Sequence, residues 1–101
     1  MQDHVEAYFS DEPVLVQIAK CESRFRHYDK NGKPLRGEQN RFDLGVMQIN
    51  EIYHGDQAKK LGLDLSSIGD NMAYARYLYE KEGTQPWSSS ASCWDKGISK
   101  N

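Results

Sequence analysis

The segment LVQIAKCESRF, residues 15–25, decides the fold, because it combines a helical pattern of apolar side chains with one acidic side chain in their midst. At about 100° per residue, Glu22 falls in the middle of a helix face that carries Leu15, Ile18, Ala19 and Phe25. An ionised carboxylate without a partner is costly to bury, so we expect Glu22 to be paired, protonated or exposed to a cleft. A buried ion pair with one of the 13 Lys and Arg residues, or a different phase of the helix, also fits the pattern.

Length and composition are typical of one small globular domain. The 101 residues are expected to form a single domain, with a core at about 10–95 and a flexible C-terminal tail. The net charge of −2 and the absence of a basic stripe argue against nucleic acid as a partner. No apolar run approaches the roughly 18 residues of a membrane span. The N-terminal sequence MQDHVEAYFS lacks the basic and apolar regions of a secretion signal.

The first half of the chain is predicted to be organised by one helix. Pro13, preceded by acidic residues, indicates a helix over 12–24, with an amphipathic lead-in at 1–9 that packs on it. Asn31-Gly32 predicts a small hairpin, because this pair favours a two-residue turn. After a polar loop at 37–43, the apolar segment LGVMQIN at 44–50 is interpreted as a short buried helix with Gln48 facing outward.

The second half of the chain is predicted to hold two more helices. A short helix over 56–61 ends at Gly62, and a longer one begins after a Ser67–Asp70 capping box and continues to Gly83. The remaining tail is expected to be loop-like, with Trp87 and Trp94 folded back over the helices. The predicted fold is therefore mainly α, with a short hairpin and a cleft beside the 12–24 helix.

The sequence favours neither a metal site nor a cofactor. Cys21 and Cys93 are too few for a zinc site, so they form either a disulfide or two buried thiols. The three histidines lack metal-ligand spacing and are interpreted as surface or packing residues. Asp29 and Asn31 do not start a calcium loop, because the glycine is misplaced and the closing glutamate is absent. We predict no metal and no cofactor.

One carboxylate in an apolar setting, with many aromatic side chains, is suited to chemistry on sugars. A carboxylic acid kept protonated by an apolar pocket can protonate the leaving oxygen of a glycosidic bond. Aromatic faces stack on sugar rings as readily as they fill a core. The aromatic candidates are Tyr28, Tyr53, Tyr74, Tyr77, Trp87 and Trp94.

Three motifs in order, CESRF at 21–25, GVMQIN at 45–50 and YARYL at 74–78 after Asn71, resemble the lysozyme-like superfamily. The resemblance is greatest to the soluble lytic transglycosylases and covers about residues 13–83. These enzymes carry a glutamate–serine pair at the end of a helix and a G-L-M-Q segment roughly twenty residues later. The placement of Cys21 and Cys93 is also similar to the resuscitation-promoting factors, which implies that these two cysteines are bonded.

The resemblance implies a set of site residues. Glu22 would be the catalytic acid, and Gln48 with Met47 would line the cleft. Ser23 and Tyr77 match family positions near the site more loosely. The alanine-tyrosine-asparagine motif of the transglycosylases is replaced by PWSSSASCW, so we assign Trp87 to that wall of the cleft. Asp43 is the candidate second carboxylate, with a solvent-facing loop aspartate as the alternative interpretation.

The implied activity is cleavage of the β-1,4 bond between N-acetylmuramic acid and N-acetylglucosamine in peptidoglycan, by a monomeric lytic transglycosylase with one catalytic glutamate. The partners would be peptidoglycan glycan strands, and the location would be extracytoplasmic. Three alternatives are a hydrolytic muramidase that uses Asp43, a peptidoglycan-binding module without catalysis, and a purely structural interaction domain.

Overall fold

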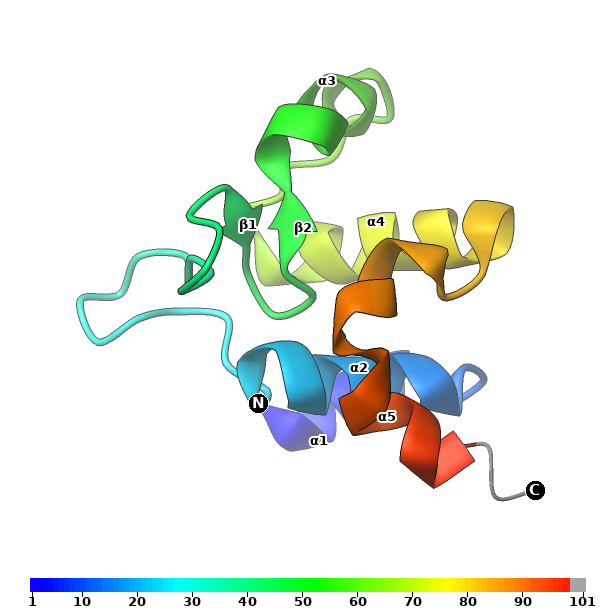
Figure 1. The fold of residues 1–101 in the computed structure, drawn as a ribbon. Helices are drawn as coiled ribbons and strands as arrows, with labels where there is room; N and C mark the ends of the chain where they lie inside the picture. The colour runs from blue at the N-terminus through cyan, green and yellow to red at the C-terminus, as the bar shows by residue number, and fades with distance from the viewer. Residues whose placement is uncertain (99–101) are drawn as a thin grey trace.

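Helices surround a short antiparallel hairpin in the computed structural model, which describes residues 1–98 (Figure 1). In chain order the elements are α1 (Gln2–Tyr8), α2 (Pro13–Ser23), β1 (Asp43–Leu44), β2 (Ile49–Asn50), α3 (Glu51–Lys60), α4 (Ile68–Glu82), the 3₁₀ helix η1 (Gln85–Ser90) and α5 (Ala91–Ile98). The mainly α class with a short hairpin is confirmed. Within residues 1–98, no helix has the length and apolar character needed to cross a membrane.

Helix α2 packs against α1 and α5, and its apolar face is buried as the sequence pattern predicted. Leu15, Ile18 and Ala19 are fully buried, and α1 packs against α2 through the buried Val5 and Phe9. The helix begins at Pro13, because the missing N–H of proline costs nothing in a first turn. It ends at Ser23, since Arg24 takes a left-handed conformation with φ 56°. The end of α2 therefore places Glu22 in its last turn.

Residues 44–50 form a hairpin, so the predicted short helix is wrong there. Asp43 pairs with Asn50 and Leu44 with Ile49. Gly45 takes φ +75°, and a Cβ at this position would lie 2.6 Å from Asn71 Nδ2. This tight turn packs against buried polar side chains, which a pattern of apolar residues does not reveal.

Two buried polar side chains hold the hairpin turn in place. Asn71 on α4 accepts from the Met47 N–H at 3.0 Å and donates to the carbonyls of Leu44 and Leu65 at 3.0 and 2.9 Å. His27 accepts from the Val46 N–H at 3.0 Å through Nδ1, so its Nε2 carries the proton and donates to the Ser66 carbonyl at 2.8 Å. Burial lowers the pKa of His27, in keeping with this neutral form.

The predicted hairpin at Asn31-Gly32 is reduced to a turn. A single bridge joins Tyr28 and Pro34, and the Asp29 carboxylate accepts from the N–H groups of Asn31 and Lys33. The tip of this turn, residues 30–33, is exposed, so a longer ladder there would bury little apolar surface.

Helices α3 and α4 correct two boundary predictions. Helix α3 begins at Glu51 rather than 56, because the Asn50 side chain accepts from the N–H groups of Ile52 and Tyr53. Helix α4 spans the predicted region, but the capping box is wrong. Ser67 makes no side-chain cap, and Asp70 accepts instead from the Asp64 N–H at 2.9 Å.

The C-terminal segment is helical, so the prediction of a loop-like tail is wrong. Helices η1 and α5 carry Trp87 and Trp94, which are 2% and 6% exposed and so confirm the expected folding back. Helix α5 packs across α2 (Figure 1). A disulfide joins Cys93 to Cys21, whose Cα atoms lie 6.0 Å apart. The expected fraying of the last residues concerns 99–101, which lie outside the described residues.

Candidate functional site

Glu22 lies where two adjoining hollows meet. Their volumes are about 350 and 480 Å³. Both are lined by Glu22, Asn40, Asp43, Gln48 and Ser89. We call the two hollows together the cleft. The cleft therefore brings Glu22 from α2, Asp43 from β1 and Gln48 from the hairpin turn into one solvent-accessible space.

The Glu22 carboxylate is half-buried and is held by a hydroxyl group. Ser90 Oγ donates to Glu22 Oε2 at 2.5 Å and accepts from the Trp94 indole N–H at 3.0 Å. Neither of the two ion pairs among the described side chains involves Glu22. The structure thus favours a carboxyl group in a cleft over the alternative of a buried ion pair.

Burial raises the pKa of Glu22, the Ser90 hydrogen bond lowers it, and the negative charge of Asp43 raises it further. Burial also raises the pKa of Asp43, and a hydrogen bond from the Asn50 amide at 3.2 Å opposes that change. The two carboxyl groups therefore share one electrostatic environment in which Glu22 retains its proton to higher pH than an exposed glutamate.

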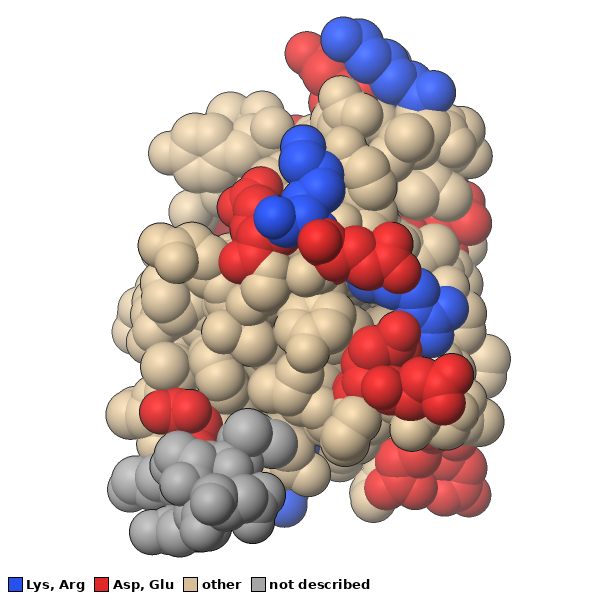
Figure 2. Space-filling view, turned by 90° about the vertical axis from the view of Figure 1, so that its right-hand side faces the viewer, with Lys and Arg blue, Asp and Glu red and all other residues tan. Residues whose placement is uncertain are grey.

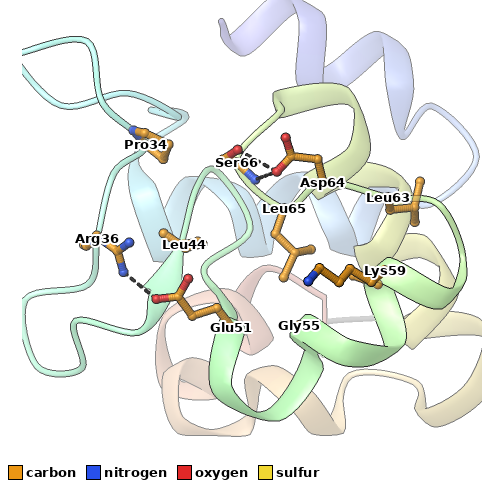
Figure 3. A pocket seen from close by; sticks show the side chains of 11 residues that line it. Pro34, Arg36, Leu44, Glu51, Gly55, Lys59, Leu63, Asp64, Leu65 and Ser66 are labelled. Carbon is orange, nitrogen blue, oxygen red and sulfur yellow. Dashed lines mark hydrogen bonds and ion pairs between the residues drawn. The ribbon is translucent and has the colours of Figure 1, made fainter.

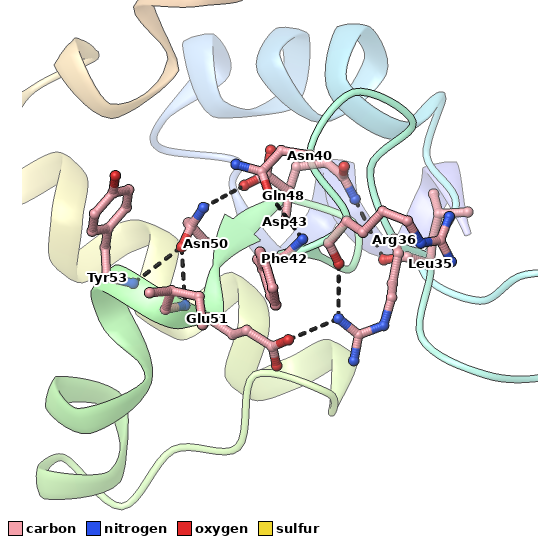
Figure 4. Close-up of polar contacts among 11 residues, drawn as sticks. Leu35, Arg36, Asn40, Phe42, Asp43, Gln48, Asn50, Glu51 and Tyr53 are labelled. Atoms are coloured by element: carbon pink, nitrogen blue, oxygen red, sulfur yellow. Dashed lines mark hydrogen bonds and ion pairs between the residues drawn. The ribbon is translucent and has the colours of Figure 1, made fainter.

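Polar contacts around the hairpin orient the second wall of the cleft (Figure 4). The Asn50 amide contacts Asp43, and its oxygen caps α3. Gln48 takes a left-handed backbone conformation with φ 52° and donates to the Gly45 carbonyl at 2.9 Å. Gln48 is only half-buried and lines both hollows, so it does face the cleft.

Of the other predicted site residues, Ser23 lines the larger hollow and Trp87 the smaller one, whereas Met47 and Tyr77 line neither. Ser23 is buried, and its hydroxyl lies 2.8 Å from the Val46 carbonyl, which ties α2 to the hairpin. Met47 is fully buried and lines neither hollow, whereas Trp87 lines the smaller one. Tyr77 lies outside the lining of both hollows, and its hydroxyl accepts from Gln57 at 3.2 Å.

Among the residues that line the cleft, Ser90 was not singled out from the sequence, and Tyr53 was named only as one of several aromatic candidates. Ser90 lies in a serine run, and only its place near the C-terminal cysteine hinted at proximity to Glu22. Tyr53, which is 81% exposed, lines the smaller hollow. It lies in the first turn of α3, which begins at Glu51 rather than at the predicted residue 56.

Another hollow, of about 400 Å³, does not include Glu22 (Figure 3). Leu44, Leu63 and Leu65 line it, and the Arg36–Glu51 ion pair of 2.8 Å lies on one side. Among the described residues there is no group of three or more His, Cys, Asp or Glu side chains that could hold a metal.

No family model, no curated protein and no solved structure matches the chain. The chemical assignment therefore depends on the cleft itself. A protonated carboxyl group can donate to a leaving oxygen, and a nearby carboxylate can activate or orient a nucleophile. Open hollows, an exposed aromatic ring and several amide side chains suit a polar, elongated ligand such as a glycan.

Proposed function

We propose that this protein cleaves the β-1,4 bond between N-acetylmuramic acid and N-acetylglucosamine in peptidoglycan, as a lysozyme-like lytic transglycosylase. The single observation that carries the proposal is the half-buried Glu22 carboxyl, with raised pKa, at the centre of an open cleft. Burying an acid in this way is costly, and such groups cluster at catalytic sites. The CESRF and GVMQIN motifs, whose resemblance suggested this reaction, supply Glu22 and Gln48 to that cleft.

In the proposed mechanism, Glu22 acts first as an acid and then as a base. Its proton passes to the glycosidic oxygen as the bond to the muramyl anomeric carbon breaks. The resulting carboxylate then accepts the proton of the muramyl 6-hydroxyl, whose oxygen bonds to the anomeric carbon. The products are a 1,6-anhydromuramyl end and a free N-acetylglucosamine hydroxyl, and no water is consumed.

A hydrolytic route is the second candidate, because Asp43 lines the same two hollows as Glu22. Asp43 would orient or activate a water molecule that attacks the anomeric carbon, and the product would keep a reducing end. The Asn50 amide, which donates to Asp43 at 3.2 Å, would hold that carboxylate in place.

We also propose an extracytoplasmic location and the lysozyme-like fold. The Cys21–Cys93 disulfide supports the location, because such bonds persist in oxidising compartments. The mainly α architecture, with the acid at the end of α2 and a hairpin across from it, supports the fold.

The proposal is tested by incubating purified peptidoglycan with the wild type and with Glu22→Gln, followed by mass spectrometry of the soluble products. Anhydromuramyl ends from the wild type alone would support transglycosylation by Glu22. Reducing ends would indicate hydrolysis, and loss of those ends in Asp43→Asn would assign the water-activating role. A matched control is Glu80→Gln, which changes an exposed glutamate on α4 and should release products at the wild-type rate.

Stability separates loss of chemistry from loss of folding in Glu22→Gln. The folded state raises the pKa of Glu22 and so binds its proton more tightly than the unfolded chain. That stabilisation is present below the unfolded pKa and is lost as pH rises through the folded pKa. At neutral pH the midpoint of unfolding of the variant should therefore lie at a denaturant concentration at least as high as that of the wild type. Product release by Glu22→Gln would place the acid elsewhere, and release by neither protein would contradict the proposed activity.

A further inference from the structure

We infer that one arm of the cleft, lined by Arg24 and Arg26, binds the carboxylates of the peptide stem on the muramyl residue. The inference rests on the proposed function, and it specifies the form of the substrate. Glycan that carries stems would be preferred to glycan from which the stems have been removed. The inference rests on the charged residues that line one hollow but not the other.

The two arms of the cleft differ in charge. The larger hollow adds three arginines, Arg24, Arg26 and Arg36, and one acid, Glu38, to the shared residues. The smaller hollow adds Glu82 and no Lys or Arg. Glu22 and Asp43 lie in both, so the basic character belongs to the larger arm alone. A substrate with an anionic and a neutral half would therefore enter in one orientation.

The three arginines differ in their existing partners. Arg36 already pairs with Glu51 at 2.8 Å and contacts the Arg41 carbonyl at 2.8 Å (Figure 4). Arg26 uses only Nε, which donates to the Ser23 carbonyl at 3.0 Å. Among the described side chains, none pairs with the Arg24 guanidinium. Arg24 and Arg26, both exposed, therefore keep donors without a partner among the described protein residues, at the lining of the larger hollow.

This local charge does not come from a generally basic protein. The chain has a net charge of −2, and basic and acidic side chains lie side by side on the face in Figure 2. The left-handed conformation of Arg24 ends α2 directly after Glu22 and Ser23, which keeps Arg24 beside the acid.

Guanidinium groups and peptide stems are chemically matched. The planar fork of arginine binds carboxylates through two parallel N–H bonds, more specifically than an ammonium group does. In peptidoglycan the stem is attached to the same muramyl sugar whose anomeric bond is cleaved, and it carries free carboxylates. The smaller arm would receive the neutral N-acetylglucosamine side, where the exposed Tyr53 offers a ring face.

The test uses defined soluble fragments of glycan, with stems and without stems. Calorimetry on the wild type and on Arg24→Ala/Arg26→Ala gives affinity, and steady-state cleavage gives KM and kcat separately. Exposed charge pairs contribute little binding energy, so we expect the double variant to weaken binding of stem-bearing fragments by about 3- to 10-fold. The change should appear in KM rather than in kcat. The variant's affinity for stem-free fragments should be unchanged. A control, Lys30→Ala/Lys60→Ala, removes the same charge from exposed positions outside the cleft.

The outcomes separate this inference from the proposed activity. Loss of the preference for stems in the arginine variant, but not in the lysine control, supports the inference. Equal affinity of the wild type for both fragments overturns it, even if both are cleaved. A stem preference in binding without cleavage of either fragment would support the inference and contradict the proposed catalysis. Binding of neither fragment would overturn both.

Discussion

Replacing Asn71 by alanine is expected to detach the hairpin from α4, because this one amide satisfies three backbone groups. Its oxygen accepts from the Met47 N–H, and its nitrogen donates to the carbonyls of Leu44 and Leu65. Asn71 is fully buried, so water does not replace these bonds without entering the core. The same hairpin carries Asp43 and Gln48 toward Glu22.

The expected loss of unfolding free energy follows from those three hydrogen bonds. A buried backbone donor or acceptor left without a partner costs about 1–3 kcal/mol, and partial relaxation of the hairpin reduces the sum to about 4 kcal/mol. Small domains have unfolding free energies of about 5–15 kcal/mol, so Asn71→Ala removes a large part of the total. The melting temperature should fall by about 20 °C.

Urea denaturation, followed by the fluorescence of the buried Trp87 and Trp94, measures this loss. The matched control is Asn31→Ala, an exposed asparagine whose side chain makes no hydrogen bond to a described residue, and it should change the unfolding free energy by less than about 0.5 kcal/mol. A loss below about 1 kcal/mol in Asn71→Ala would refute the argument that this amide anchors the hairpin.

Two further perturbations act on the carboxyl group and on the cross-link. In Ser90→Ala, loss of the hydrogen bond that lowers the Glu22 pKa should move the alkaline limb of the pH–activity profile to higher pH. The kcat should fall about tenfold, while Ser88→Ala retains the wild-type profile, and a limb moving to lower pH would contradict this role. Reduction of Cys21–Cys93, separated by 72 residues, should cost about 4 kcal/mol, and an unchanged melting curve by circular dichroism would show that the cross-link contributes nothing.

Periodicity predicted the parts of the fold that depend on a repeating apolar face. Helices α2 and α4 lie where the pattern placed them, and the core contains Leu15, Ile18 and Met72 as expected from spacing. These helices bury one face against the rest of the chain, and the sequence repeats that face every third or fourth residue. Where burial follows a regular repeat, the sequence alone is sufficient to predict the helix and its buried face.

The hairpin and α5 were not predicted, because both depend on contacts between distant residues. The apolar pattern of the segment 44–50 fits either a helix or a strand. Its turn is held by Asn71 and His27, which lie 24 and 19 residues away in sequence from the backbone groups that they bind. Helix α5 is short, and it is placed by the bond from Cys93 to Cys21 and by the buried Trp94. Short elements gain their stability from tertiary packing rather than from local propensity.

The candidate site shows the same division between local and distant information. Glu22 was identifiable because an acidic side chain within an apolar stripe is a local anomaly, visible in the segment 15–25. Ser90 was not, because nothing in a serine run shows which hydroxyl will reach a carboxylate 68 positions earlier. The disulfide joins the neighbours of these two groups, since Cys21 precedes Glu22 and Cys93 lies on α5 three residues after Ser90. The cross-link thus stabilises the domain and also holds the Ser90 hydroxyl against the Glu22 carboxyl. Reduction of the disulfide should therefore change the Glu22 titration before it unfolds the chain.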